Sequence, residues 1–445
     1  MKKPKLPTYI NGVTFLTSLL PTLCLADETA GATAEQVAAA VAPAVNPGDS
    51  AWMMISTALV LFMTPGLAFF YGGMVRTKNV VATLMQSLIA LPIISLVWFA
   101  FGYSIAFSPT HGGLIGGLDW IFLKTVGGAP NADYAATIPH DLFMTFQCMF
   151  AVITPALISG AFAERMKFSA YLLFIILWSL LVYSPLAHWV WGVGGMLRSQ
   201  GVLDFAGGLV VHLSAGTSAF AAALAIGPRT DFKKAPAAPA SLALVVLGTG
   251  MLWFGWFGFN AGSAVGSNEL ASIVFTNSHF ATASAATVWM ILEWLHRGKP
   301  SIMGVCISMV VGLIAVTPAG GFVTISSAML IGALAGAASY IVAVIRGNSK
   351  LDDTLDVFAC HGVAGTLGVL MTGFLATKSI NAAGADGSMD LFLTQLKAVG
   401  IVASFCFIMT FAILKGINLL VGLRPTPSEE AEGLDTTQHG ERLSS

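Results

Sequence analysis

The chain has 445 residues, of which 56% are hydrophobic and only 10% are charged, and its net charge at pH 7 is −1. A soluble domain carries about 25% charged residues. This chain therefore has too little polar surface to cover its apolar side chains in water, and a lipid bilayer is the solvent that accepts them. The near-zero net charge also excludes the basic surface that nucleic-acid binding requires.

Residues 1–26 are predicted to be a cleaved secretory signal. Several lysines begin the chain, an apolar stretch follows at Val13–Leu20, and small residues end the segment at Ala26. The alternative is an uncleaved transmembrane helix, but the apolar stretch is short for a span and Pro21 interrupts it, which favours cleavage after Ala26. Residues 27–48 would then form a periplasmic leader.

Apolar runs of roughly 20 residues, the length that crosses a bilayer, follow along the rest of the chain. They lie at residues 51–74, 80–107, 139–163, 169–197, 205–227, 240–262, 270–296, 301–317, 320–346, 355–376 and 391–422. None of them alternates like the strands of an outer-membrane barrel. We expect an all-α polytopic membrane protein with 11 transmembrane helices, formed by residues 49–423.

The basic residues of the loops predict the orientation in the membrane. One set of alternate loops holds Arg76, Lys78, Arg165, Lys167, Arg229, Lys233, Lys234, Arg297, Lys299, Arg346 and Lys350, and the other set holds only Lys124, Arg198 and Lys378. Basic residues favour the cytoplasmic side. The protein is therefore predicted to lie in the inner membrane with its mature N-terminus periplasmic and its C-terminus cytoplasmic, in agreement with the signal peptide.

Two segments share the pattern D-x7-H-x2-A-G-T. Asp204 is followed eight residues later by His212, Asp353 is followed eight residues later by His361, and each histidine precedes Ala-Gly-Thr. The copies fall on the fifth and tenth runs, so an odd number of spans separates them and the two halves must have opposite orientation. Inverted repeats of this kind are typical of transporters, with the solute site near the midplane.

The repeat halves are residues 51–227 and 240–376, and a final helix follows at 391–422. An ionisable ring at bilayer depth is costly and usually faces a bundle interior or a pathway. One such histidine can be a hydrogen-bonded core residue, but two at matched positions favour a pathway in which His212 and His361 meet. The small residues after each histidine allow close helix approach.

Other side chains could select a cation. Asp204 has the position of a helix N-cap, and this role is compatible with drawing cations inward. Aromatic faces attract cations, and Trp191, Phe146, Phe150 and Phe259 lie in the spans near their periplasmic half or middle. Composition alone does not separate these four from aromatic residues that only pack.

Several stretches resemble signatures of the Amt/Mep/Rh ammonium transporter family. They are Phe70-Tyr71-Gly72-Gly73 with Lys78-Asn79, Gly160–Arg165, Asp204–Gly208 with His212 and Gly227-Pro228-Arg229, Gly255–Ser263, Asp356-Val357-Phe358 with His361-Gly362, and the tail Glu432–Asp435 with His439-Gly440. The resemblance covers nearly all of the mature chain in order. One departure is that Trp191-Gly192-Val193-Gly194-Gly195 carries one more residue than the usual W-G-G-G stretch.

The resemblance implies a homotrimer with a separate pore in each subunit. No cofactor is expected, and no metal site either, because no cysteine has a metal-type spacing to another. It implies a periplasmic ammonium-binding site at Trp191, Phe150 and Ser263 with Phe146 nearby, a gate of Phe150 and Phe259, twin pore histidines His212 and His361, and a supporting acid at Asp204. Ammonium would lose a proton and cross as ammonia, which potassium cannot do. Electrogenic transport is favoured, and conduction of ammonia alone stays open.

Three alternatives remain. An ammonium sensor of this family often carries a fused signalling domain, whereas only a short tail at residues 424–445 follows the last span. A channel for neutral ammonia or carbon dioxide would also use an apolar pore. The third alternative is an intramembrane enzyme, but the chain lacks the motifs of such enzymes, for example H-E-x-x-H, so no enzyme activity is expected.

The composition of the tail alone predicts disorder. The resemblance implies instead a regulatory segment that docks on the cytoplasmic loops and responds to a PII-type nitrogen-regulatory protein.

Overall fold

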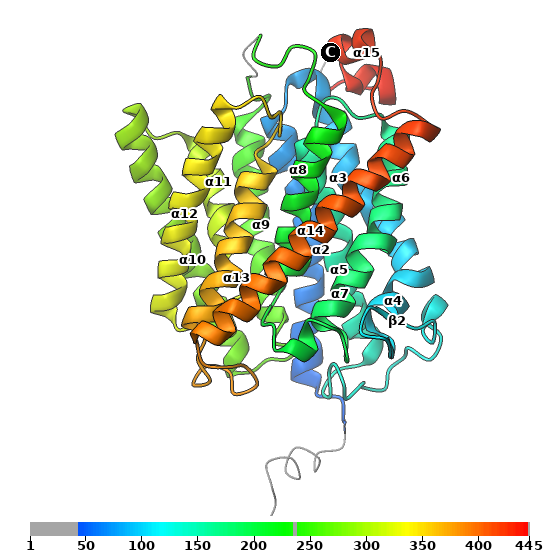
Figure 1. Ribbon diagram of the computed structural model, residues 1–445, viewed down its shortest axis with the longest axis vertical. Coiled ribbons are helices and arrows are strands. Elements are labelled where there is room, and N and C mark those ends of the chain that lie inside the picture. The colour runs from blue at the N-terminus through cyan, green and yellow to red at the C-terminus, as the bar shows by residue number, and fades with distance from the viewer. Residues whose placement is uncertain (1–42, 235–237, 444–445) are drawn as a thin grey trace, which may run out of the picture. The chain divides into compact units, whose positions relative to one another are not determined.

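A computed structural model describes residues 43–234 and 238–443. The predicted signal peptide and most of the predicted leader lie outside these described residues. The first half contains α2 (Pro47–Met74), α3 (Val80–Val97), α4 (Tyr103–Phe107), α5 (His140–Ile158), α6 (Phe168–Trp178), α7 (Ser184–Trp191) and α8 (Ser214–Ile226) (Figure 1). The second half contains α9 (Leu242–Gly262), α10 (Glu269–Arg297), α11 (Ile302–Val316), α12 (Ile325–Asn348), α13 (Val363–Leu375), α14 (Met389–Leu420) and the short tail helix α15 (Pro427–Glu432).

Shorter elements connect or extend these helices. They are the 3₁₀ turns η1 (Thr77–Asn79), η3 (Ile121–Leu123), η4 (Ser159–Ala161) and η6 (Arg198–Gln200), and the π-helical turns η2 (Trp98–Gly102), η5 (Ser179–Tyr183), η7 (Gly208–Leu213), η8 (Phe358–Gly362) and η9 (Asp435–His439). Strands β1 (Thr110–His111) and β2 (Ile115–Gly116) pair antiparallel in the loop after α4, with Thr110 opposite Gly116. The sequence had not indicated this hairpin.

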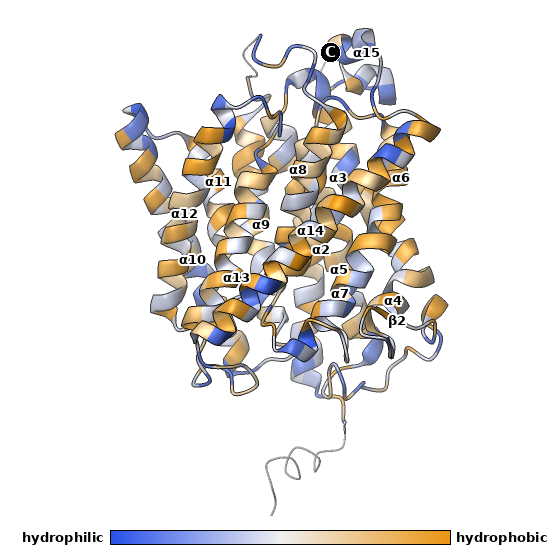
Figure 2. Ribbon diagram, viewed as in Figure 1, coloured by the Kyte–Doolittle hydropathy of each residue, from blue (hydrophilic) through white to orange (hydrophobic). Residues whose placement is uncertain are grey.

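Each predicted apolar run coincides with a helical segment. Among the described residues, 9 helical segments are long and apolar enough to cross a membrane, and α11 is a shorter apolar helix. The remaining segment is α10, which is 29 residues long and more polar. Figure 2 shows an apolar middle on these helices and more hydrophilic residues toward their ends, as a bilayer-spanning bundle requires.

The two halves pack with opposite direction, as an inverted repeat demands. A β-carbon placed on Gly73 would lie 2.7 Å from the backbone nitrogen of Val245, and one placed on Gly262 would lie 2.7 Å from the β-carbon of Ser56. Residue numbers therefore rise along α2 as they fall along α9, so these helices, the first of each half, are antiparallel. Glycine at these positions lets the two backbones approach closely.

The fifth span of each half repeats this relation around the histidines. A β-carbon on Gly216 would lie 2.2 Å from the backbone nitrogen of Gly362, and one on Gly365 would lie 3.0 Å from the β-carbon of His212. The glycine of each Ala-Gly-Thr sequence thus packs against the π-helical turn of the other half. Turns of this kind are frequent at functional sites, and here η7 carries His212 while η8 carries His361.

One end of the bundle gathers charged loops and the C-terminal tail. Arg76 and Arg229 both pair with Glu164, which joins three loops that are distant in sequence. The tail lies on the same end, where Lys78 donates to the carbonyl oxygen of Glu430 at 3.0 Å and the backbone nitrogen of Ala82 donates to Asp435 at 2.8 Å. The last residues of the described chain are therefore packed against the loops.

Candidate functional site

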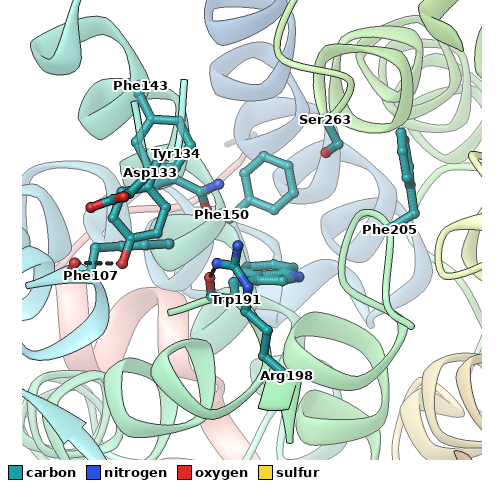
Figure 3. A pocket seen from close by; sticks show the side chains of 10 residues that line it. Phe107, Asp133, Tyr134, Phe143, Phe150, Trp191, Arg198, Phe205 and Ser263 are labelled. Carbon is teal, nitrogen blue, oxygen red and sulfur yellow. Dashed lines mark hydrogen bonds between the residues drawn. The ribbon is translucent and has the colours of Figure 1, made fainter. Parts of the chain in front are cut away.

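A pocket of about 160 Å³ lies at the end of α7, opposite the tail helix α15 (Figure 1), and Figure 3 shows it from close by. Its lining residues are Phe107, Asp133, Tyr134, Phe143, Gln147, Phe150, Trp191, Arg198, Phe205 and Ser263. We call it the outer pocket. Three of the residues predicted to bind a cation, Trp191, Phe150 and Ser263, line it together.

Trp191 ends α7, and its ring is fixed by a hydrogen bond. The indole Nε1 donates to the carbonyl oxygen of Asp204 at 2.9 Å, and the ring meets that of Phe150 edge-on at 6.1 Å. The Ser263 hydroxyl donates to the carbonyl oxygen of Phe259 at 2.9 Å, so its lone pairs remain able to accept. The outer pocket thus offers an aromatic face and a hydroxyl acceptor.

Two stacked phenyl rings lie at the inner end of the outer pocket, and Phe150 is the one of the two that lines it. Phe150 and Phe259 stack at 4.1 Å with an interplanar angle of 29°, and each is 1% exposed. Phe146 does not line the pocket. It is buried and packs edge-on against Phe150 at 5.0 Å, while the neighbouring Gln147 is the residue of this helical turn that faces the pocket.

His212 and His361 lie beyond the phenyl pair and contact each other. Their Nδ1 atoms are 3.2 Å apart. One ring must donate and the other must accept, so two neutral imidazoles in this contact have opposite tautomers, and one Nε2 is an acceptor while the other is a donor. The Nε2 of His212 is buried without a hydrogen-bond partner in the described chain. The indole of Trp256 stacks on the same ring at 5.4 Å.

The space beside the histidines is small and apolar. A cavity of about 10 Å³ is lined by Met63, Leu67, Phe70, Ile153, Leu157, Val211, His212, Leu252, Trp256, Phe259, Val310 and His361. This volume is near the minimum that holds one water-sized molecule. Apart from the indole of Trp256, the imidazoles are the polar side chains that line it, so a solute here meets two hydrogen-bonding groups in an apolar bottleneck.

Further spaces follow between the histidines and the other end of the bundle. A second space of about 10 Å³ shares Phe70, Val310 and His361 with the first. It in turn shares Met74, Ile307 and Leu355 with a pocket of about 870 Å³ that includes Asp356, the ion-pair partner of Arg346. The lining residues therefore trace a route from the outer pocket, past the phenyl and histidine pairs, to the end that carries the tail.

Known proteins resemble this chain in sequence and in fold. The profile described as the Ammonium Transporter Family matches residues 51–443. The chain belongs to the ammonium transporter family. An ammonium transporter of Bacillus subtilis (strain 168) is 47% identical over 400 residues, which cover 89% of this chain and 98% of the relative. The predicted family is thereby confirmed, and its members are transporters rather than enzymes.

Solved structures agree with the fold. The crystal structure of Saccharomyces cerevisiae Mep2 has a TM-score of 0.81 and 34% identity, and the match covers 86% of this chain and 91% of that one. A structure described as a sensor Amt protein has a TM-score of 0.81 and 29% identity over 88% of this chain and 98% of that one. The predicted all-α multi-span membrane fold is confirmed.

In this ammonium transporter, Asp204 and Asp353 hold matched positions before the π-helical turns. Asp204 accepts from the backbone nitrogens of four residues, Gly207, Gly208, Leu209 and Val210, at 2.5–3.2 Å. Asp353 accepts from the backbone nitrogens of Val357 and Phe358. Both carboxylates are therefore caps of the turns that carry the histidines, and neither lines the cavity.

The backbone around these caps repeats as well. The residue three positions after each aspartate is left-handed, with φ of 116° at Gly207 and 57° at Asp356. Burial raises the pKa of Asp204 although four backbone hydrogen bonds act to lower it. Burial and the nearby Asp356 charge raise the pKa of Asp353 to about 6. Such matched local geometry supports the inverted repeat at the level of single residues.

The buried carboxylate of Glu164 organises the loops at the tail end. Its side chain is 1% exposed and accepts from Arg76 at 2.6 Å and from Arg229 at 2.9 Å. Burial alone would raise the pKa of Glu164, but hydrogen bonds and charge from Arg76 and Arg229 lower it to about 2. Sequence reasoning missed this cluster because its members come from separate loops.

Replacing Glu164 by glutamine should lower the free energy of unfolding by roughly 3 kcal/mol at pH 7, because Arg76 and Arg229 lose a buried anionic partner. A depressed carboxyl pKa stabilises the fold above about pH 5, and the stabilisation disappears as the pH falls toward 2. The difference between wild type and E164Q in thermal unfolding in detergent should therefore shrink between pH 7 and pH 3.

The matched control for E164Q is Asp231→Asn. Asp231 also pairs with Arg76, but its side chain is 39% exposed. Exposed pairs contribute at most about 1 kcal/mol, so this variant should unfold nearly as wild type does. An E164Q deficit of the same size at both pH values would contradict the assigned role of the Glu164 charge.

Proposed function

We propose that this ammonium transporter takes up ammonium at the outer pocket and passes it inward as ammonia. The observation that carries the proposal is the order of groups along the route: an aromatic pocket, a stacked phenyl pair, and an apolar bottleneck that holds a contacting pair of imidazoles. Each stage suits a different form of the solute. The outer pocket suits a cation, and the bottleneck suits a small neutral molecule.

At the outer pocket, the cation loses part of its hydration and gains contacts with the protein. The Trp191 ring contributes a cation–π interaction, which reaches about 2 kcal/mol when the site is desolvated. The Ser263 hydroxyl oxygen, whose hydrogen is used toward Phe259, accepts a hydrogen bond from ammonium. Phe150 supplies a second aromatic surface and also forms the floor.

Beyond the phenyl gate, the bottleneck excludes bare ions. Moving a charge into an apolar environment is far costlier than moving a neutral polar group, so potassium is stopped at Phe150 and Phe259. Ammonium can release a proton and enter as ammonia, which then bonds to the paired imidazoles. We favour separate conduction of the proton through His212 and His361, with Asp204 supporting deprotonation, so that net transport is electrogenic.

The orientation follows from charge. The end that carries the tail also carries Arg76, Arg229 and Arg346 in its loops, and basic residues favour the cytoplasmic side. We therefore assign this end to the cytoplasm and the outer pocket to the periplasm, in an inner membrane. This direction would expose the aromatic pocket to external ammonium.

The docked tail supports a regulatory role. The Glu430 carboxylate accepts from Arg424 at 2.5 Å and from the backbone nitrogen of Thr230 at 2.8 Å, and Leu434 donates to Asn79 at 2.9 Å. These contacts join the tail to two loops beside the inner opening. We propose that a PII-type regulatory protein binds this face, that the transporter functions as a homotrimer, and that tail position responds to the partner.

Uptake of labelled methylammonium into proteoliposomes tests the proposed function. Uptake should be competed by ammonium and not by potassium. Trp191→Leu should raise the methylammonium KM by about tenfold, the equivalent of losing most of one cation–π contact. Trp189→Leu is a control, because that indole packs against Phe405 and does not line the outer pocket. Equal competition by potassium, or an unchanged KM in W191L, would contradict the proposal.

A further inference from the structure

Arg198 places a positive charge in a pocket that is proposed to receive a cation. It begins the 3₁₀ turn η6, shortly after α7, and its side chain lines the outer pocket. Its Nη1 donates to the carbonyl oxygen of Trp191 at 2.5 Å. In Figure 3 the dashed line at the Arg198 guanidinium marks this hydrogen bond to Trp191.

This charge is not neutralised by an ion pair. None of the ion pairs among residues 43–234 and 238–443 includes Arg198. The one carboxylate among the lining residues is that of Asp133, which Figure 3 shows apart from the guanidinium. The Arg198 charge also acts across the pocket: burial raises the pKa of Tyr134, and the Arg198 charge opposes this rise.

The charge of Arg198 opposes cation binding in the outer pocket. Its charge repels any cation at the Trp191 ring, with an energy that falls with distance and with ionic strength. The hydrogen bond to the carbonyl oxygen of Trp191 holds the guanidinium at this pocket. Asp133 acts in the opposite direction, since its carboxylate attracts cations to the same space.

We propose that Arg198 is a specificity-determining residue that lowers the cation affinity of the outer pocket, and that the carboxylate of Asp133 raises it. This inference rests on the proposed uptake of ammonium at the outer pocket. Arg198 weakens ammonium binding, makes it dependent on ionic strength, and disfavours divalent cations more strongly than monovalent ones. Ammonium therefore binds less tightly in the outer pocket and leaves it faster toward the Phe150–Phe259 gate.

The test compares methylammonium KM in proteoliposomes at about 10 mM and about 500 mM sodium chloride, where the screening length changes from about 30 Å to a few ångströms. Arg198→Gln should lower the KM about three- to tenfold at low salt, and the gain should nearly vanish at high salt. Arg198→Lys keeps the charge and should behave as wild type. Asp133→Asn should raise the KM at low salt.

Lys397→Gln is the matched control. Lys397 donates to Gln200 of η6 but does not line the outer pocket, so its loss should leave the KM within about twofold of wild type, because the Coulomb energy falls with distance from the bound cation. An unchanged or raised KM in R198Q would overturn the inference, and so would an R198K variant that matches R198Q, because the guanidinium contact rather than the charge would then matter. If W191L raises the KM and R198Q does not lower it, only this inference fails.

Discussion

A variant with leucine at both His212 and His361 should lose ammonium transport by about a hundredfold or more, or should begin to pass potassium. Positioned proton-transfer groups contribute about 10²- to 10⁴-fold, and among residues 43–234 and 238–443 the two imidazoles are the only ionisable groups that line the bottleneck. Without them, ammonia has no pair of hydrogen-bonding groups there and the proton has no carrier. Ammonium and potassium fluxes into proteoliposomes measure both effects.

His279→Leu is the control for the double variant. His279 lies on α10, stacks on Trp253 at 5.5 Å, and is not among the residues that line the route. It should transport at the wild-type rate, which separates loss of a pore imidazole from loss of any histidine. Wild-type rate and selectivity in the double variant would rule out a filtering role for His212 and His361.

Asp204→Ala should abolish transport, and Asp204→Asn should reduce it about tenfold or more. Alanine leaves four buried backbone N–H groups without an acceptor, and each costs about 1–3 kcal/mol. Asparagine keeps one side-chain oxygen but loses the charge and the second acceptor, and hydrogen bonds to charged groups are worth about 1.5–3 kcal/mol. Transport rate and the yield of folded protein should be measured together.

Asp386→Asn is the comparison for both Asp204 variants. Asp386 accepts from the backbone nitrogen of Lys378 in an exposed loop. The Asp386→Asn variant should therefore fold and transport as wild type does. If Asp204→Ala folds and transports normally, the cap is not required to hold the turn η7 that carries His212. Normal folding of Asp204→Asn with a reduced rate would separate support of transport from support of the fold.

The helical segments and the histidine pair could be predicted from the sequence, because both depend on the length and spacing of residue patterns. Apolar runs located the helical segments because a bilayer demands a fixed length of apolar chain. The D-x7-H-x2-A-G-T repeat placed His212 against His361 because matched positions of inverted halves meet near the pseudo-symmetry axis. The resemblance supplied Trp191, Phe150, Ser263 and Phe259, which composition could not select from many aromatic residues.

Several side chains of the site were not identified from the sequence. Phe146 and Gln147 are neighbours on α5, but Gln147 shares one face of the helix with Phe143 and Phe150, which line the outer pocket, while Phe146 is buried. Trp256 lies one turn before Phe259 on α9, a spacing that could have indicated its contact with His212. Arg198 had been counted only as a loop charge. The Glu164 cluster joins loops that are far apart in sequence, and no local pattern marks such contacts.

The proposed function requires that the apolar bottleneck with its paired imidazoles passes ammonia and refuses bare ions. The most direct measurement is the current across bilayers that contain the wild-type protein, with ammonium and potassium applied in turn at equal concentration. We expect a saturable current with ammonium and none above background with potassium. A potassium current of comparable size would mean that unprotonatable cations cross the Phe150–Phe259 gate, and the account would be wrong.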